Sequence, residues 1–438
     1  MTAPTDKRGS LARVVGASLI GTTIEWYDFF LYGSAAALVF NKLFFPSDDP
    51  LTGTLLAFLT YAFGFAARPL GGLVFGHFGD RLGRKRLLIV SLLGMGLATV
   101  LIGVLPTFAT VGAAAPIMLT SLRMIQGFAL GGEWGGAVLL VSEHGDARRR
   151  GFWASWPQAG APGGNLLATA VLALLAAFQS NEAFLAWGWR IPFLLSGVLV
   201  LVGLWIRLSV SESPLFEGTA AETERLPILG VLRDHWRDVL VATGARIAEN
   251  VSYYVITAFV LVYVTEHLKL PQSIALDAVL IGSIVHFVSI PLWGALSDRV
   301  GRRPVYLLGA VGVGAWAFAF FPLLDTKSFL FTTIAVTIGL VLHGAMYGPQ
   351  AAFFSELFAT RLRYSGASMG YQVASIVAGS LAPIIATLLL KTYGTAVPIS
   401  VYVLGAAAIT VIAVALARET RGRDLAFATP AATVKVGE

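Results

Sequence analysis

Seven ionisable side chains interrupt the long apolar stretches of this sequence, and they are the first candidates for chemistry. A charge at the centre of a bilayer costs about 2.5–3.5 kcal/mol, so such a group lines a polar cavity or pairs with an opposite charge. Their spacing predicts which of them share a helix face. The four acids and three bases are Glu25, Asp28, Glu133, Glu249, Arg68, Arg123 and Arg246.

Two of the acids form a candidate proton site. Glu25 and Asp28 are three residues apart, which makes them neighbours on one face of a helix. Two close carboxylates in an apolar setting repel each other, and protonation of one of them relieves the repulsion. We expect one of the two to carry a proton, with Asp28 ahead of Glu25. The alternative is that each pairs permanently with an arginine, for which Arg68 and Arg123 are candidates.

A further acid and base lie on a later apolar stretch. Arg123 stands one turn before Gln126, and Glu133 follows Gln126 by two turns on the same face. A guanidinium keeps its charge and stabilises a nearby carboxylate. For Glu133, a structural ion pair and a proton relay both stay open. Small residues at four-residue spacing also predict close helix packing at Gly127, Gly131, Gly132, Gly135 and Gly136.

A polar stripe in the second half of the sequence is a candidate substrate site. Arg246, Glu249, Asn250 and Tyr253 fall on one helix face. A guanidinium with an amide and a phenol can hold a carboxylate by charge-assisted and neutral hydrogen bonds. The alternative is an internal Arg246–Glu249 pair that only cancels charge.

A second stripe repeats this pattern further along the chain. His343, Tyr347 and Gln350 stand at positions i, i+4 and i+7. For His343, a structural hydrogen-bond donor and a residue of the cavity both stay open. Other polar and aromatic side chains are expected to complete the chamber or to form its walls. These are Gln126, Gln158, Asn165, Tyr371, Gln372, Trp26 and Tyr27.

The elements that must position these residues follow from composition. Of 438 residues, 56% are hydrophobic and 13% are charged, whereas a soluble protein carries roughly 25% charge. So few polar groups cannot cover a water-exposed surface, which argues against disorder and against a soluble enzyme. The absence of cysteine excludes disulfides, thiol catalysis and cysteine-ligated metals. The length accommodates twelve membrane helices of roughly 20–25 residues.

The distribution of charge predicts the topology. Basic residues gather in alternate loops, around positions 7–13, 81–86, 148–150, 207–237, 299–303, 361–363 and 418–423. Because lysine and arginine stay on the cytoplasmic side during insertion, both termini are expected to be cytoplasmic, which requires an even number of spans. The net charge of +6 then reflects topology and needs no nucleic-acid partner.

The apolar stretches predict an all-α polytopic membrane protein with twelve transmembrane helices in two pseudo-symmetric six-helix halves. The longest hydrophilic stretch, 209–237, is expected to be a cytoplasmic loop between residues 1–208 and 238–417, and a cytoplasmic tail follows at 418–438. The expected spans are 12–42, 52–78, 87–106, 114–142, 151–178, 188–208, 238–265, 274–296, 304–323, 329–354, 365–390 and 396–417.

Two motifs of the first half recur in the second. Residues 76–86 read GHFGDRLGRKR and residues 294–303 read GALSDRVGRR, with 218 positions between Asp80 and Asp298. A Ser-Glu pair that precedes basic residues also recurs, with 213 positions between Glu143 and Glu356. Two motifs in one order and at nearly one spacing indicate a duplicated unit.

These residues resemble the major facilitator superfamily. Both loop motifs match its Gly-x-x-x-Asp-Arg-x-Gly-Arg-Arg/Lys signature, and RMIQG at 123–127 matches its Arg-x-x-Gln-Gly element. A narrower likeness is to the metabolite:proton symporter family, which includes shikimate, α-ketoglutarate, citrate and proline/betaine carriers. It rests on EWYDF at 25–29, RPLGG at 68–72, GGEWGG at 131–136, WGWRIPF at 187–193 and RYSGA at 363–367.

The resemblance implies two halves that rock about a central substrate site, with Arg123 as a partner in proton coupling. In the family, the loop aspartate (here Asp80) sits near the start of the eleventh helix, where unpaired N–H groups and the helix dipole stabilise it. We therefore expect a cytoplasmic latch between the halves; the alternative is ordinary anchoring charges. Its residues are Gly76, Asp80, Arg84 and Glu143 in the first half and Asp298, Arg302 and Glu356 in the second.

The sequence thus predicts a secondary active transporter, not an enzyme, without a cofactor or metal. We expect proton-coupled uptake of a small organic anion, a hydroxy- or keto-carboxylate such as shikimate, by a monomer in the inner membrane. The alternatives are a carrier of a zwitterion such as proline or betaine, a proton-driven exporter, and a membrane receptor without transport.

Overall fold

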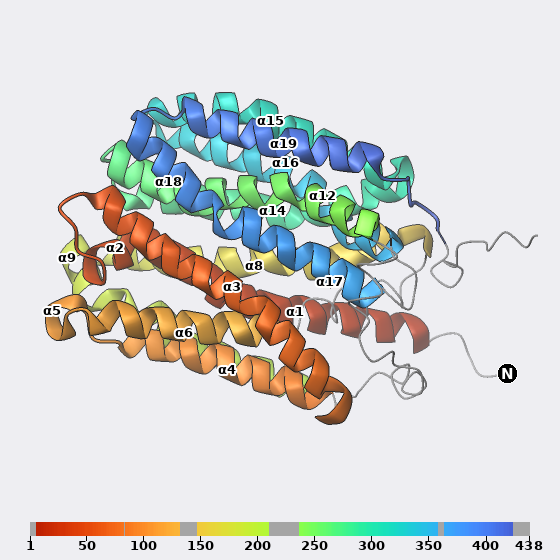
Figure 1. Ribbon diagram of the computed structural model, residues 1–438, viewed down its shortest axis with the longest axis horizontal. Helices are drawn as coiled ribbons and strands as arrows, with labels where there is room; N and C mark the ends of the chain where they lie inside the picture. The colour runs from red at the N-terminus through yellow and green to blue at the C-terminus, as the bar shows by residue number, and fades with distance from the viewer. Residues whose placement is uncertain (1–5, 83, 132–146, 210–235, 358–362, 424–438) are drawn as a thin grey trace, which may run out of the picture.

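The computed structural model describes residues 6–82, 84–131, 147–209, 236–357 and 363–423 (Figure 1). Within its helices, the side chains of 6–14, 73, 75–82, 84–88, 147, 207, 209 and 363–368 are not described. The regular structure of the described residues is entirely helical. This agrees with the predicted fold class, because a chain segment in a bilayer satisfies its own backbone groups only as a helix.

The first group of helices extends from residue 6 to residue 209. Its first and last rods contain a π-helical segment, and a short 3-10 turn precedes α8. The elements are α1 (Asp6–Ala35), η1 (Ala36–Phe40), α2 (Asn41–Leu43), α3 (Pro50–Leu82), α4 (Arg84–Val104), α5 (Phe108–Val111), α6 (Ala114–Leu130), η2 (Ala147–Arg149), α8 (Arg150–Phe178), α9 (Asn181–Ala183), η3 (Phe184–Gly188) and α10 (Arg190–Ser209).

The second group begins at Trp236. Figure 1 shows it as a second bundle alongside the first, with its rods running in nearly the same directions. The elements are α12 (Trp236–Tyr254), η4 (Val255–Phe259), α13 (Val260–Val262), η5 (Tyr263–His267), α14 (Gln272–Val300), α15 (Arg302–Asp325), α16 (Phe329–Leu357), α17 (Arg363–Ala374), η6 (Ser375–Ser380), α18 (Ala382–Tyr393) and α19 (Val397–Leu416).

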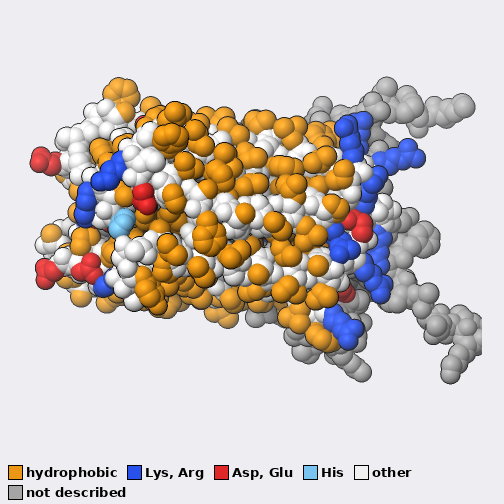
Figure 2. All heavy atoms as spheres, turned by 90° about the horizontal axis from the view of Figure 1, so that it is seen from above, with side chains coloured by type: hydrophobic (Ala, Val, Ile, Leu, Met, Phe, Trp, Pro, Cys, Tyr) orange, Lys and Arg blue, Asp and Glu red, His pale blue; other side chains and the backbone are white. Residues whose placement is uncertain are grey.

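Many of these rods are suited to a bilayer. Among the described residues, eight helices are long and apolar enough to cross a membrane, and the bent pair Asn181–Gly188 and Arg190–Ile206 makes a ninth. Ile89–Val104 and Ala114–Leu130 are apolar but shorter. On the face that Figure 2 shows, hydrophobic side chains cover the middle of the molecule between its two charged ends, as a lipid-facing surface requires. The exact number of twelve spans stays a prediction.

The two groups meet along two seams. α8 of the first group packs against α14 and α16 of the second, and α3 packs against η6 and α18. The rod Trp236–His267 is buried almost all round, unlike the other apolar rods, which are about half buried. Polar residues on this rod are therefore removed from lipid, which places a candidate site at the centre of the molecule.

Charged side chains lie at the two ends of the bundle. We call one the arginine-rich end; Figure 2 shows its basic side chains gathered together, and Arg148, Arg149, Arg299, Arg418 and Arg421 are exposed. The opposite end carries charges of both signs, among them Lys42, Asp49, Glu266 and Lys391. The start of α1 and the end of α19 both lie at the arginine-rich end (Figure 1). This arrangement requires an even number of crossings, as the charge distribution predicts.

Glycines allow α3 and α6 to lie in direct backbone contact. A side chain at Gly127 would overlap the carbonyl of Gly64, and one at Gly131 would overlap the carbonyl of Arg68. The predicted close packing is therefore present at Gly127 and Gly131. The other three glycines of that prediction lie outside the described residues.

Candidate functional site

The predicted stripe on α12 is a cluster of buried polar groups. Arg246 Nε lies 3.4 Å from Glu249 Oε2, and Asn250 Nδ2 donates to the same oxygen at 3.2 Å. Arg246, Glu249 and Asn250 are all buried. The internal Arg246–Glu249 pair that we kept as an alternative is thus present, but it does not stand alone.

The predicted stripe on α16, which contains His343 and Gln350, contacts this cluster directly. His343 Nε2 lies 3.4 Å from Glu249 Oε1, and Gln350 Nε2 donates to Glu249 Oε2 at 3.4 Å. Arg246 Nη1 donates to Gln350 Oε1 at 3.3 Å. The ring of Tyr347 lies 5.4 Å from that of His343. The two stripes, which are about one hundred residues apart in sequence, therefore form one network around Glu249.

Two members of this network were not predicted. His286 on α14 is fully buried, and its Nε2 lies 2.9 Å from His343 Nδ1. Tyr306 on α15 accepts a hydrogen bond from Gln350 Nε2 at 2.9 Å and donates to the carbonyl of Ala245 at 3.0 Å. An intramembrane histidine is itself a signal of function. His286 carried that signal, whereas Tyr306 lies among apolar residues and carried none.

Side chains of the first group reach this network across the seam. Gln158 Nε2 on α8 donates to Gln350 Oε1 at 3.4 Å. Two turns further along α8, Asn165 Nδ2 donates to Ser283 Oγ on α14 at 3.0 Å. Both residues were expected in a shared chamber, and the structure places both in contact with the second group.

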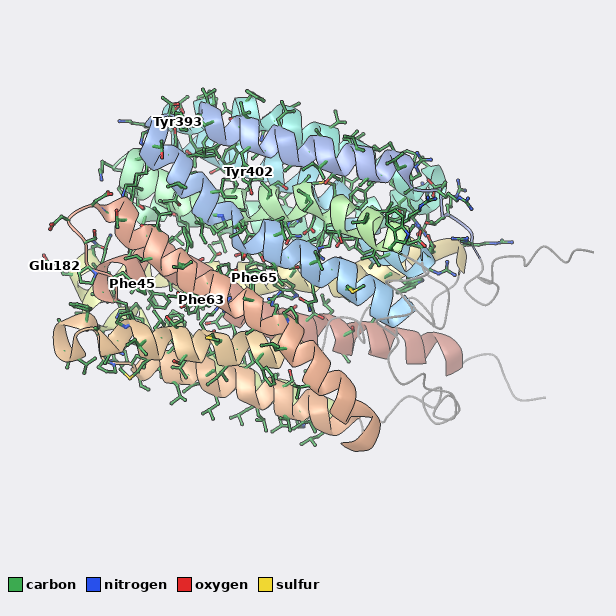
Figure 3. All side chains as sticks on the ribbon, viewed as in Figure 1. Phe45, Phe63, Phe65, Glu182, Tyr393 and Tyr402 are labelled. Atoms are coloured by element: carbon green, nitrogen blue, oxygen red, sulfur yellow. The ribbon has the colours of Figure 1, made fainter. Side chains whose placement is uncertain are left out.

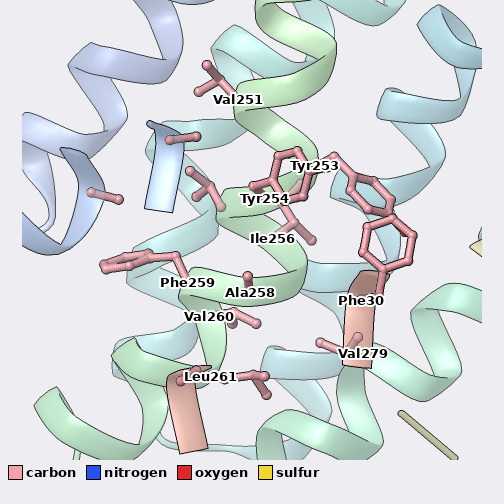
Figure 4. Packing of buried hydrophobic residues seen from close by; sticks show 14 of the residues in the cluster. Phe30, Val251, Tyr253, Tyr254, Ile256, Ala258, Phe259, Val260, Leu261 and Val279 are labelled. Atoms are coloured by element: carbon pink, nitrogen blue, oxygen red, sulfur yellow. The ribbon is translucent and has the colours of Figure 1, made fainter. Parts of the chain in front are cut away.

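Aromatic rings cover the same region. Figure 4 shows Phe30 of α1 directed toward Tyr253 of α12, with ring centroids 5.2 Å apart. Trp26 stacks on Phe30 at 5.0 Å. The Arg246 guanidinium lies over the ring of Tyr371, with its carbon 3.3 Å from the centroid. Trp26, which we expected in a wall of the chamber, and Tyr253 of the predicted stripe therefore lie on the same aromatic cluster beside the α12–α16 network.

A second polar cluster lies inside the first group around Asp28. Asp28 Oδ1 accepts a hydrogen bond from Ser196 Oγ at 2.5 Å. Asp28, Arg123 and Gln126 line a cavity of about 10 Å³, which is about the space of one water molecule. Arg123 and Glu25 also act electrostatically on Asp28. A buried acid beside a fixed guanidinium is suited to reversible protonation.

Arg123 itself is held mainly by aromatic rings. Its guanidinium carbon lies 4.6, 4.4 and 4.5 Å from the ring centroids of Phe29, Tyr32 and Tyr61. Arg123 Nη1 donates to Gln126 Oε1 at 3.1 Å. Such cation–π contacts stabilise a desolvated charge by about 2 kcal/mol.

Several predicted residues lie apart from the α12–α16 network. Tyr27 donates to the carbonyl of Pro192 at 2.7 Å, which directs it into the first group. Gln126 donates to Thr99 Oγ1 at 2.7 Å, next to Arg123 and not next to Arg246. Gln372 Oε1 is buried without a hydrogen-bond partner among the described residues. Glu133 lies outside the described residues.

The repeated motif joins the two groups at the arginine-rich end. Asp298 at the end of α14 accepts hydrogen bonds from the backbone N–H groups of Gly151 and Phe152, at 2.8 and 2.9 Å. These are unpaired donors in the first turn of α8, where the dipole also favours a carboxylate. Arg302 Nη1 holds the same Asp298 at 2.7 Å. The motif aspartate of the second half is thus bonded to the first.

A buried ion-pair network extends this contact. Glu356 Oε1 lies 2.8 Å from Arg150 Nη1 of α8 and 3.1 Å from Arg302 Nη2. Of the first-half copy, Glu143 lies outside the described residues. Gly76 and Asp80 lie on α3 and Arg84 on α4, but their side chains are not described.

Two ion pairs join the groups at the opposite end. Lys391 Nζ lies 2.7 Å from Asp49 Oδ2, and Lys42 Nζ lies 3.7 Å from Glu266 Oε1. The groups are therefore in contact at both ends as well as along the seams. The polar network around Glu249 lies between these two sets of contacts.

Two helical bundles in contact at both ends, with a polar network buried at their seam, define a membrane transporter of the two-bundle type. The chain belongs to the major facilitator superfamily, whose pattern matches residues 18–378 and 251–433. As a member of that family it is a transporter and not an enzyme.

Individual relatives agree with this assignment. The chain is 42% identical over 429 residues to the shikimate transporter of Escherichia coli (strain K12), covering 96% of this chain and 98% of that protein. It is 33% identical to the proline/betaine transporter of Salmonella typhimurium, covering 97% and 87%. Among solved structures, a D-xylose-proton symporter superposes with a TM-score of 0.75 at 18% identity, covering 94% and 99%. At 18% identity, the likeness to the xylose symporter shows a shared fold and nothing about the substrate.

Proposed function

We propose that this chain is a proton-coupled uptake carrier of a small organic anion, a hydroxy- or keto-carboxylate such as shikimate. The observation that supports it most is the network of Arg246, Glu249 and Gln350, which is buried at the seam and bonded to Gln158 of the other group. A solute held there contacts both groups, so its binding can bias their relative movement. The 42% identity to a shikimate transporter supports the carboxylate class.

The proton is assigned to the first group. Asp28, with Glu25 one turn away and Arg123 beside it, is the candidate carrier. Protonation of a buried carboxylate removes a charge that must otherwise stay solvated or paired, and so favours occlusion. Glu133 is a second candidate, because it is an acid of an apolar stretch that lies two turns after Gln126 on the same helix face.

The orientation follows from charge. The arginine-rich end is assigned to the cytoplasm of the cell by the positive-inside rule, which makes both termini cytoplasmic. Asp298, Arg302 and Glu356 then form a cytoplasmic latch that opens when the halves part at that end. Asp80, Arg84 and Glu143 are assigned the same role in the first half. The carrier is proposed to act as a monomer in the inner membrane.

The second candidate is uptake of a zwitterion such as proline or betaine. The cluster of aromatic rings formed by Trp26, Phe30 and Tyr253 favours it, because a quaternary ammonium group binds to aromatic faces. The 33% identity to a proline/betaine transporter points in the same direction.

Transport in proteoliposomes separates these possibilities. Purified protein would be reconstituted and given an inward pH gradient with radiolabelled shikimate, α-ketoglutarate, citrate, proline or betaine. We expect gradient-driven accumulation of a carboxylate that collapses when a protonophore is added. Accumulation of betaine but of no carboxylate would support the second candidate, and efflux against the gradient would indicate an exporter.

A further inference from the structure

Arg68 on α3 is a buried cation that the network described above does not use. Its side chain is 2% exposed. Its guanidinium carbon lies 4.4 Å from the ring centroid of Phe29 and 4.5 Å from that of Phe65, with Trp26 at 5.9 Å. Figure 3 labels Phe65 midway along α3, beside the second bundle. The rings stabilise the charge but offer no hydrogen-bond acceptors.

Two of its donors have no partner. Arg68 Nε and Nη2 are buried and make no hydrogen bond to any described residue. A buried charged donor without an acceptor destabilises the protein, so such a donor calls for a partner. The N–H groups on Nε and Nη2 form one edge of the guanidinium and point the same way, which matches the two oxygens of a carboxylate.

The position of Arg68 is at the seam. Phe65, which lies against its guanidinium, contacts Tyr254 of α12 with ring centroids 5.9 Å apart. Tyr254, Tyr371 and Arg246 of the second group are near enough to act electrostatically on Arg68. Arg68 is thus a first-group cation close enough to Arg246 of the second group for the two charges to interact.

The other buried arginines have an acid nearby that balances their charge. Glu249 balances the charge of Arg246, and Glu356 and Asp298 balance Arg302. Arg123 Nε and Nη2 also lack a hydrogen-bond partner among the described residues, but its Nη1 donates to Gln126 and its charge acts on the nearby carboxylate of Asp28. A site that attracts an anion needs a positive charge that is not yet neutralised, and among the described side chains Arg68 fits that requirement best.

We propose that Arg68 binds the carboxylate of the substrate through its Nε–H and Nη2–H edge, while the Arg246 network holds the polar remainder. This inference rests on the proposed function and gives it a specific anion site. Because the two arginines belong to different halves, a substrate that contacts both holds the halves together. The aromatic wall of Phe29, Phe65 and Tyr254 excludes water from the charge pair, which strengthens it.

The test compares an acid with its uncharged ester. Equilibrium binding of shikimate and methyl shikimate would be measured on the full chain in nanodiscs, for the wild type and for Arg68→Gln and Arg68→Lys. We expect Arg68→Gln to weaken shikimate binding by about 10–100-fold and to leave the ester unchanged, the range expected for a charge-assisted pair. Arg68→Lys keeps the charge but lacks the paired edge, so we expect an intermediate loss. Arg237→Gln, an exposed change of the same kind, should alter neither ligand.

Two outcomes would overturn the inference. Parallel loss of acid and ester binding would indicate a structural arginine, and an unchanged preference for the acid in both variants would place the carboxylate elsewhere. If the Arg68→Gln variant does not fold, the Arg68→Lys variant provides the test: its ratio of the dissociation constants for shikimate and methyl shikimate should be higher than that of the wild type, and an unchanged ratio would overturn the inference. Failure of the wild type to bind shikimate, α-ketoglutarate or citrate would instead refute the carboxylate substrate of the proposed function.

Discussion

At the scale of single residues, Glu249 is the junction of the second-half site. Its carboxylate is approached by the side chains of Arg246, Asn250, His343 and Gln350. A buried charge is tolerated when it is paired and its lone pairs are hydrogen-bonded. Removal of one partner therefore tests whether the pair is structural or serves the substrate.

The first prediction concerns this pair. Arg246→Gln leaves the Glu249 carboxylate buried without its countercharge, so we expect a loss of about 3–5 kcal/mol in stability. The double variant with Glu249→Gln should recover most of that loss, because both charges are gone. Unfolding of the purified variants in detergent measures both effects. A double variant that is stable but does not bind substrate would assign Arg246 to the site; one that transports normally would leave the pair a structural one.

The second prediction concerns the proton. Asp28→Asn keeps the shape of the side chain and its contact with Ser196 but cannot release a proton. We expect pH-driven accumulation to be abolished, while counterflow exchange, which needs no net proton movement, is retained. Asp277→Asn, on α14, is the matched control and should transport as the wild type. Unchanged accumulation by the Asp28 variant would remove Asp28 from the mechanism.

Residue patterns predicted which side chains share a helix face better than which helices meet. The spacing of Arg246, Glu249 and Asn250 correctly placed them on one face, because helical periodicity reports which side chains share a face. That His343 would meet Glu249 could not be predicted, since periodicity does not identify the neighbouring helix. Tyr27 shares α1 with Trp26 but points toward Pro192, because adjacent residues on a helix lie on different faces.

At the scale of elements, the packing of α8 on α14 determines how closely the halves approach. A side chain at Gly294 of α14 would place its Cβ 2.5 Å from the carbonyl of Gly151 and 2.8 Å from Ser155 Oγ on α8. Backbone atoms cannot yield as a flexible side chain does, so glycine is required for this contact. The repeated loop motif begins at this same glycine.

The third prediction follows from this contact. Gly294→Ala should separate α8 from α14, weaken the bonds from Asp298 to the start of α8, and reduce transport by at least about tenfold. Gly405→Ala on α19 is the control, since nothing lies within 4 Å of the added carbon. Gly405→Ala should keep transport and gain up to about 1 kcal/mol in stability from helix propensity. Equal transport by both variants would show that the close approach is dispensable.

Element positions were largely predictable, whereas their internal irregularities were not. The expected span 151–178 corresponds to α8 (Arg150–Phe178), because a long apolar stretch between charged loops has few alternatives. The π-helical segments η4 (Val255–Phe259) and η6 (Ser375–Ser380) have no such signal. Each is one widened turn, and such turns are frequent at functional sites.

At the scale of the whole molecule, contacts between the halves at both ends explain why the site is enclosed. Arg150–Glu356 joins them at the arginine-rich end, and Asp49–Lys391 joins them at the opposite end. The first pair is buried and the second is largely exposed. An exposed ion pair contributes only about 0.2–1 kcal/mol, so the opposite end should open more easily, and loss of this pair should be enough to populate an open form.

The last prediction concerns the pH dependence of that end. The hydrogen bond from Lys391, followed by that from Thr52, lowers the pKa of Asp49 below its ordinary value of 3.8. A lowered pKa means that the contact is fully present above pH 3.8 and is lost only as the pH falls through the lower value. External acidification from pH 7.5 to 5.5, the condition of the proposed proton-driven uptake, should therefore leave this end closed.

Spin labels can measure this directly, because the chain has no cysteine of its own. Labels on cysteines at Glu182 and Tyr393, exposed positions that Figure 3 labels on the two bundles, would report their separation. We expect the same distance distribution at pH 7.5 and 5.5 in the parent, and a longer component at both pH values after Asp49→Asn. Asp48→Asn, the adjacent exposed acid, should leave the distances unchanged. A longer component that the parent develops at pH 5.5 would show that a group other than Asp49 controls the opposite end, since Asp49 stays ionised there.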